Sequence, residues 1–175
     1  AGGWWTSAGN YDISWYDEAE DSFSISSPAQ LAGVAYLVKN GRTFEGKTVT
    51  LTGNIDLDGL KWEPIGKANL QQIFKGVFDG GGYEIHNLRS EVISTGEAYS
   101  GLFGAIYQAQ VTRVVLAEDC EIRTSYYGGG VVAYAQESEI VSCANRASVS
   151  FEGPAGYVGG IAGYVALASS IDRCE

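Results

Sequence analysis

The side chains that could act as acid, base or nucleophile are few. The chain contains one histidine, His86, so a Ser-His-Asp triad would depend on this residue and a histidine-rich metal site cannot form. His86 lies between Ile85 and Leu88, two apolar residues that we expect to point into a core. We therefore expect the imidazole of His86 to lie on the solvated surface, without a catalytic role.

Carboxylates at predicted turns offer a second possible chemistry. Pairs of Asp or Glu cleave glycosidic bonds, and Asp56, Asp58 and Asp79 follow short apolar segments. Asp-Gly is also the ordinary composition of a tight turn, in which Asp accepts hydrogen bonds from its own backbone. We predict turn roles for these residues and hence no catalytic residues, no metal site and no cofactor. A polysaccharide-degrading hydrolase or lyase is the alternative.

Aromatic residues offer a binding role instead of a catalytic one. Large flat side chains near Asn and Asp can stack on sugar rings while the polar groups hold the hydroxyls. The candidates for such a site are Trp4, Trp5, Trp15, Tyr16 and Trp62. The alternative is that these rings seal the N-terminal end of the domain, because large aromatics commonly dominate such packing.

The three cysteines do not form a metal motif. Cys120, Cys143 and Cys174 contain no CxxC pair, and an odd number cannot close completely into disulfides. We expect buried, small apolar side chains. A disulfide between Cys143 and Cys174 is the alternative.

Composition narrows the fold and the partners. The 175 residues include 24 glycines, 3 prolines and 11 tyrosines, and 45% of the chain is hydrophobic, which is typical of one domain with many turns and β-type positions. A formal net charge of -10 repels phosphate backbones, so nucleic acid is not an expected partner. The chain has no apolar run long enough for membrane insertion. Because it starts at Ala1 without Met, we expect that a leader or upstream sequence has been removed.

One helix is predicted near the N-terminus. Ser27-Pro28-Ala29-Gln30 has the form of a capping box with proline at the first helical position, and Asn40-Gly41 supplies a stop. Apolar residues recur at helical spacing between these signals. We interpret residues 1–46 as an irregular leader, a short strand at 22–25 and a helix that caps the end of the domain.

Residues 47–175 are predicted to form stacked coils of short strands. Gly101, Gly130 and Gly160 each open an apolar segment, and their spacings are 130 - 101 = 29 and 160 - 130 = 30. A period near 30 without helices favours an all-β fold, a parallel β-helix with three short strands per coil. The residues expected to shape its corners are Asp79, Gly80, Gly81, Gly82, Gly101, Gly104, Gly130 and Gly160.

Stacked coils place equivalent residues above one another. The spacing predicts three columns: Tyr127 with Tyr157, Tyr134 with Tyr164, and Cys143 with Cys174. The stretch FKGVFDGGGYEIHNL, residues 74–88, is predicted to be a corner of the first full coil rather than a hairpin. By the same alignment, Ile85 and Leu88 should occupy the places of Val111 and Val114.

Several blocks together resemble one protein family. SPAQLAGVAYLVKNG, GKTVTLTGNIDLDG, WEPIG, FKGVFDGGGYEIHNL and GLFG, followed by the glycine segments GGVVAY and GGIAGY, resemble the GLUG-repeat family over residues 12–175. The resemblance implies a right-handed parallel β-helix of a secreted or cell-surface bacterial protein, with an adhesive or scaffolding role and no agreed catalytic residues. A host or bacterial glycan or protein is then the expected partner.

The expected function follows from these points. We expect a non-enzymatic adhesive or scaffolding module, with a carbohydrate-binding module and a polysaccharide-degrading enzyme as alternatives. The chain stops at Asp172-Arg173-Cys174-Glu175 in the middle of a predicted coil, so we expect a fragment of a longer protein. Its open C-terminal coil would offer unpaired amides to another copy or a neighbour.

Overall fold

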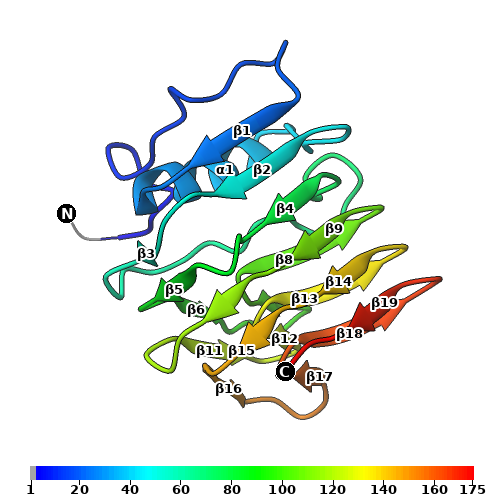
Figure 1. Ribbon diagram of the computed structural model, residues 1–175. Helices are drawn as coiled ribbons and strands as arrows, with labels where there is room; N and C mark the ends of the chain where they lie inside the picture. Colours follow the sequence, from blue (N-terminus) through cyan, green and yellow to red (C-terminus); the bar gives the residue numbers. More distant parts are fainter. Residues whose placement is uncertain (1–2) are drawn as a thin grey trace.

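Short strands follow one another along almost the whole chain, and from β2 onward none pairs with the next strand in sequence. Each pairs in parallel with the equivalent strand one coil away. The computed structural model describes residues 3–175, and these form a parallel β-solenoid of about five turns with a single helix (Figure 1). The predicted all-β fold, a parallel β-helix with one N-terminal helix, is confirmed.

Five parallel sheets make up the walls, and we number them in the order in which the chain visits them. Sheet 1 contains β1 (Ser22–Ile25), β2 (Thr48–Leu51), β4 (Val77–Asp79), β9 (Gln110–Thr112), β14 (Glu139–Val141) and β19 (Ser170–Asp172). Sheet 2 contains β3 (Ile55–Asp56), β5 (Glu84–His86), β10 (Val115–Leu116) and β15 (Ala144–Asn145). Sheet 3 contains β6 (Arg89–Val92), β11 (Glu121–Thr124) and β16 (Ser148–Phe151).

The remaining two sheets are formed by the tyrosine- and glycine-rich segments. Sheet 4 contains β7 (Tyr99–Ser100), β12 (Tyr127–Gly129) and β17 (Tyr157–Gly159). Sheet 5 contains β8 (Phe103–Tyr107), β13 (Val132–Gln136) and β18 (Ala162–Ala166).

A full coil therefore contains five short strands, and the predicted number of three is wrong. One extra bend follows β11, where the Thr124 hydroxyl accepts from the Tyr126 amide at 3.3 Å and donates to the Tyr127 carbonyl at 2.8 Å. Another bend lies at Gly130, between β12 and β13. A side-chain hydroxyl that bridges its own backbone is a local turn device, and here it divides a wall that the sequence suggested was one strand.

The helix α1 (Pro28–Lys39) forms as its capping signals predict. The Ser27 hydroxyl accepts from the Gln30 amide at 3.1 Å, and the Gln30 side chain accepts from the Ser27 amide at 3.2 Å. Its buried residues join the main hydrophobic core. In Figure 1 the helix lies behind β1 and β2 at the N-terminal end of the solenoid, as expected of a cap.

The leader contributes more to the solenoid than the sequence suggested. The strand at 22–25 is confirmed as β1, and it pairs with β2 so that Phe23 lies beside Val49. Sheet 1 therefore begins before residue 47. Within residues 3–175, no helix is long and apolar enough to cross a membrane.

The corner at Asp79–Tyr83 has the predicted role but shifts the register. β4 and β5 lie in different sheets, so this stretch is a corner of a coil and not a hairpin. Asp79 pairs with Thr112 and Glu84 with Val115, so this corner contains two more residues than the corner one coil later. The predicted alignment of Ile85 with Val111 is therefore wrong. Phe78 pairs with Val111, and Ile85 pairs with Leu116.

The last coil packs on the preceding coil with one face, and its other face is more exposed. Each of β15 to β19 is the end strand of its sheet. Ile171 is 45% exposed, whereas Ile140, its partner one coil earlier, is fully buried. Pairing of this end with another copy stays a prediction.

Candidate functional site

Tyrosines form two columns along the outside of the solenoid. In sheet 4, Tyr127 stacks on Tyr99 with ring centroids 4.9 Å apart and on Tyr157 at 5.5 Å. In sheet 5, Tyr134 stacks on Tyr164 at 5.4 Å. The strand registers place these residues opposite one another, which confirms both predicted tyrosine columns.

The two columns pack against each other across the bend at Gly130. Tyr127 meets Tyr134 edge to face, with centroids 5.8 Å apart and ring planes at 80°. Tyr157 meets Tyr164 in the same way at 5.0 Å and 74°. Edge-to-face and offset-stacked contacts are the favoured geometries for aromatic pairs. The tyrosines therefore form one fixed layer and not a set of independently mobile side chains.

The first tyrosine of each column has a face on which no aromatic ring is stacked. Tyr99 lies in β7, the end strand of sheet 4, so no earlier strand of that sheet covers it. Tyr134 has Ala105 as its partner in the preceding coil, and alanine has no ring to cover it. Within the described chain, the columns thus begin with two partly buried rings that each have one face, called the free face below, without a stacked aromatic ring.

Two neighbouring cavities lie at these column starts. The first has a volume of about 600 Å³, and its lining includes Trp4, Lys39, Glu63, Lys67, Glu97 and Tyr99. The second has a volume of about 400 Å³, and its lining includes Leu70, Tyr99, Tyr107, Tyr127, Tyr134 and Gln136. Both cavities share Ala68, Glu97 and Tyr99. We call the two together the aromatic groove.

Polar contacts fix the groups around the groove. The Tyr99 hydroxyl donates to Glu97 Oε2 at 2.8 Å, and Lys39 Nζ lies 3.1 Å from Glu63 Oε1. Burial is the main cause that raises the pKa of Tyr99, with the bond to Glu97 second. Burial also raises the pKa of Tyr127 to about 12. Both phenols therefore stay protonated at neutral pH and remain able to donate hydrogen bonds.

The five aromatics that the sequence proposed for binding do not form a common surface. Trp62 is fully buried and its indole donates to the Leu102 carbonyl at 3.0 Å, so its proposed contact with a ligand is wrong. Trp5 is partly buried and donates to the Leu57 carbonyl at 2.9 Å. Both indoles match the alternative role of packing inside the domain, because each buries its apolar ring and pairs its one hydrogen-bond donor.

The other three differ in their exposure. Trp15 and Tyr16 are partly buried and pack on Phe23 with ring centroids 5.3 Å away in each case. Trp4 is 37% exposed, lies under the Lys61 ammonium at 5.6 Å and lines the groove. Of the five, only Trp4 reaches the groove.

Sequence reasoning missed Tyr99 and Glu97. The signal for Tyr99 was present, because Tyr99 precedes Gly101 by two positions and Tyr127 precedes Gly130 by three. A one-residue offset in the alignment would have extended the tyrosine column backward. Glu97 carries no pattern of its own, and only the fold shows that it lies between the two cavities.

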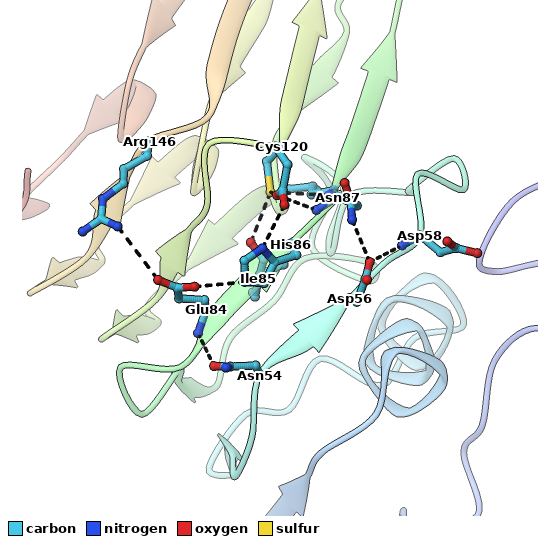
Figure 2. A network of polar contacts seen from close by, with 11 residues as sticks. Asn54, Asp56, Asp58, Glu84, Ile85, His86, Asn87, Cys120 and Arg146 are labelled. Carbon is cyan, nitrogen blue, oxygen red and sulfur yellow. Dashed lines mark hydrogen bonds and ion pairs between the residues drawn. The ribbon is translucent and has the colours of Figure 1, made fainter.

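His86 belongs to a second polar cluster on another wall (Figure 2). Its Nε2 lies 2.9 Å from Glu84 Oε2, and its Nδ1 lies 2.9 Å from Asp119 Oδ2. The imidazole faces outward as expected, but it is only 33% exposed because the two carboxylates flank it. The hydrogen bond to Asp119 is the main cause that raises the pKa of His86.

The same cluster ties neighbouring coils together. Asp119 Oδ1 accepts from the Asn87 amide at 2.9 Å, and the Asn87 side chain donates to Asp56 Oδ1 at 3.0 Å (Figure 2). These bonds are the main causes that lower the pKa values of Asp119 and Asp56. Because the charged groups satisfy one another, the cluster is built to cross-link coils along the axis.

The candidate carboxylates have the predicted turn contacts. Asp56 Oδ1 accepts from the Asp58 amide, and Asp79 Oδ1 accepts from the Gly81 amide, each at 2.8 Å. Arg113 also forms an ion pair with Asp79 and is the main cause that lowers its pKa. Asp58 itself has a positive φ of 54° at the corner after β3. Residues 3–175 contain no cluster of three or more His, Cys, Asp or Glu side chains arranged to hold a metal ion.

Two of the three cysteines have the predicted buried character. Cys120 and Cys143 are buried, Cys174 is partly exposed, and all three are free thiols in the described chain. The Cys143 amide donates to Cys174 Sγ at 3.4 Å, which confirms the predicted stacking of these two residues. Burial raises the pKa of the Cys120 thiol to about 11, and its Sγ contacts the Ile85 carbonyl at 3.2 Å, so it is not an activated nucleophile.

Comparisons with protein-family models, with curated proteins and with solved structures each found no match. The structure itself defines the class, a parallel β-solenoid with a helical cap.

Proposed function

We propose that the protein is a non-enzymatic adhesive module that binds its ligand in the aromatic groove. The observation that carries the proposal is the pair of adjoining cavities at the free ends of two tyrosine columns. Recognition sites are concave and mostly apolar, with a few fixed polar groups, and cavities of a few hundred Å³ are usual. The aromatic groove has each of these properties.

A rigid base supports a binding role. Tyr99, Tyr127 and Tyr134 lie in strands of sheets 4 and 5, and each of these three rings is held by stacked or edge-to-face neighbours. Binding groups held in this way lose little conformational entropy when a ligand arrives. A repeated solenoid also separates its two ends, as a spacing element of an adhesive protein requires.

The same proposal includes where the protein acts and what it adheres to. The resemblance to the GLUG-repeat family supports a module of a secreted or cell-surface bacterial protein. The formal net charge of -10 supports a partner other than nucleic acid. We propose an extracellular glycan or glycoprotein surface as the target of adhesion.

Adhesion can be measured with coated beads. Beads that carry the protein are applied to a mucin layer and to a layer of intact bacterial cells, and detachment under flow is recorded. Ala68→Arg should abolish adhesion, because Ala68 is exposed, lines both cavities and can carry a long side chain into them without disturbing the tyrosine columns. Tyr83→Ala is the matched control, since Tyr83 is 40% exposed at a corner outside the groove. Equal detachment of the native and Ala68→Arg beads would overturn the proposal.

One observation favours polysaccharide cleavage as a second candidate. Glu63 and Glu97 line the same cavity, and paired carboxylates perform glycoside hydrolysis. Glu63 is held by Lys39, and Glu97 accepts from Tyr99. Release of reducing ends from a polysaccharide, lost in Glu63→Gln and in Glu97→Gln, would select the enzyme; intact polysaccharide after prolonged incubation would select the binding module.

A further inference from the structure

The free faces of Tyr99 and Tyr134 indicate which ligand the groove fits, an inference that rests on the proposed function. Both rings are partly buried, and each lacks a stacked ring on the side of the preceding coil. Each ring also lines the second cavity, and Tyr99 lines the first as well. A flat apolar ring face inside a cavity suits a ligand that is itself flat and partly apolar.

Polar groups surround these faces at their edges. Gln136 accepts from the Tyr134 hydroxyl at 3.1 Å, and Asn69 also lines the second cavity. Glu97 uses Oε2 to accept from Tyr99 and has Oε1 as a further acceptor between the cavities. Amide, carboxylate and phenol groups around a stacking face match a ligand that carries hydroxyls along its edge.

The charges of the groove and of the whole molecule indicate the charge of the ligand. Lys39 and Lys67 balance Glu63 and Glu97 in the first cavity, so the groove carries no excess of positive charge for an anion. The molecule as a whole has a formal net charge of -10, which opposes anionic polymers. Positive charges also border the groove, because Lys39 and Lys67 line the first cavity and the Lys75 ammonium lies 5.4 Å from the Tyr107 ring, and these charges oppose a cationic ligand. A neutral ligand remains.

The arrangement of the cavities sets the length of the ligand. The two cavities share Ala68, Glu97 and Tyr99, so that Tyr99 lines both cavities and Tyr134 lines the second. A single ring could occupy only one of them. We propose that the aromatic groove binds a neutral glycan chain, with one sugar ring stacked on Tyr99 and another stacked on Tyr134.

The test uses defined neutral and anionic oligosaccharides. Calorimetric titrations are run with the hexasaccharides of cellulose, chitin, starch and mannan, with their monosaccharides, and with hexagalacturonate. We expect at least one neutral hexasaccharide to bind, while its monosaccharide and hexagalacturonate bind at least about tenfold more weakly. Tyr99→Ala and Tyr134→Ala should each weaken binding about tenfold, the value of one aromatic stacking contact.

Control variants keep the test decisive. Tyr83→Ala should bind like the native protein, and Ala68→Arg should not bind, with circular dichroism to confirm that each variant folds. If a tyrosine variant does not fold, Ala68→Arg alone decides whether the groove is the site. The proposal is overturned if no neutral hexasaccharide binds, if hexagalacturonate binds best, or if Ala68→Arg leaves the affinity unchanged.

A second arm separates failure of this inference from failure of the proposed function. Mucin layers are treated with periodate, which oxidises sugar diols, or with protease before the bead assay. Groove-dependent adhesion that survives periodate but not protease would leave the adhesive function in place and exclude a glycan ligand. Absence of adhesion to every layer, together with absence of saccharide binding, would exclude both.

Discussion

Tyr134 lies over Tyr164 with ring centroids 5.4 Å apart and ring planes only 10° apart. The two residues are 30 positions apart in sequence, 164 - 134, and are direct partners in β13 and β18. This contact links the repeat of the sequence to the groove, because the same stacking leaves the first ring of each column with a free face.

The tyrosine layer should contribute measurably to stability. Tyr127 stacks on two tyrosine rings and meets three more edge to face, which is more ring contacts than any other member of the layer has. Tyr127→Ala should lower the free energy of unfolding by about 2–3 kcal/mol, somewhat less than for a fully buried aromatic. Urea denaturation measures the change. Tyr83→Ala should stay within about 0.5 kcal/mol of the native protein, and equal losses in the two variants would contradict the role of the layer.

The glycine corner before β5 should be intolerant of a side chain. A Cβ at Gly80 would lie 2.4 Å from the Arg113 carbonyl oxygen of the next coil, so the backbone would have to move. Gly80→Ala should cost about 2 kcal/mol or more in unfolding free energy. Gly53→Ala is the matched control, because a Cβ there meets nothing within 4 Å. Equal stability of the two variants would show that the close contact with the next coil does not require glycine at position 80.

Much of the fold could be predicted from the sequence, and the limits have physical causes. Gly101, Gly130 and Gly160 fix the register of the later coils, and the tyrosine columns follow from it. The register of Ile85 was missed because the corner at Asp79–Tyr83 contains two extra residues, and a corner can lengthen without disturbing the alternation of the strands. Bends made by a hydroxyl, as at Thr124, leave no glycine or proline to mark them.

Several corners are also invisible in the sequence. Positive φ values recur at Arg113, Ser142 and Arg173, one coil apart, although none of these residues is glycine. The candidate site was predicted only in part for a related reason. Its tyrosine columns follow the repeat, but a cavity between coils forms where a large side chain is replaced by a small one. Ala105, the partner of Tyr134 in the preceding coil, is such a small residue.

The His86 cluster should make stability depend on pH. The folded-state pKa of His86 lies above the ordinary value of 6.5, so its contribution is complete below pH 6.5 and is lost as pH rises through the folded-state pKa. The pKa of Asp119 is lowered, so its contribution is present above 3.8 and is lost as pH falls through the folded value. Stability supplied by the pair should therefore be greatest between these limits.

A variant isolates the histidine contribution. In His86→Gln, the loss of stability on the alkaline side of pH 6.5 should disappear, because glutamine does not titrate. Urea midpoints measured across a series of pH values give the slope of stability against pH for the native protein and for His86→Gln. The absolute loss below pH 6.5 should be modest, about 0.2–1 kcal/mol for each exposed ion pair. An unchanged slope in His86→Gln would assign the pH dependence to other groups.

Thiol reactivity should distinguish free cysteines from a disulfide. Burial raises the pKa of Cys143 to about 12 and that of Cys120 to about 11, so both should be protected from an aromatic disulfide reagent. Cys174 is partly exposed and should react. We expect one reactive thiol in the native protein and three in denaturant. A single thiol in denaturant would instead establish the Cys143–Cys174 bridge.

The central claim is that the aromatic groove is the binding surface, and ligand contact at its tyrosines tests it most directly. The measurement is a nuclear magnetic resonance titration of protein with labelled tyrosine rings, using the hexasaccharide that binds best in calorimetry. The account predicts that ring signals of Tyr99 and Tyr134 shift together with a single dissociation constant, while the signals of Tyr83 stay in place. Shifts confined to Tyr83 or to rings outside the groove, with Tyr99 and Tyr134 unchanged, would contradict it.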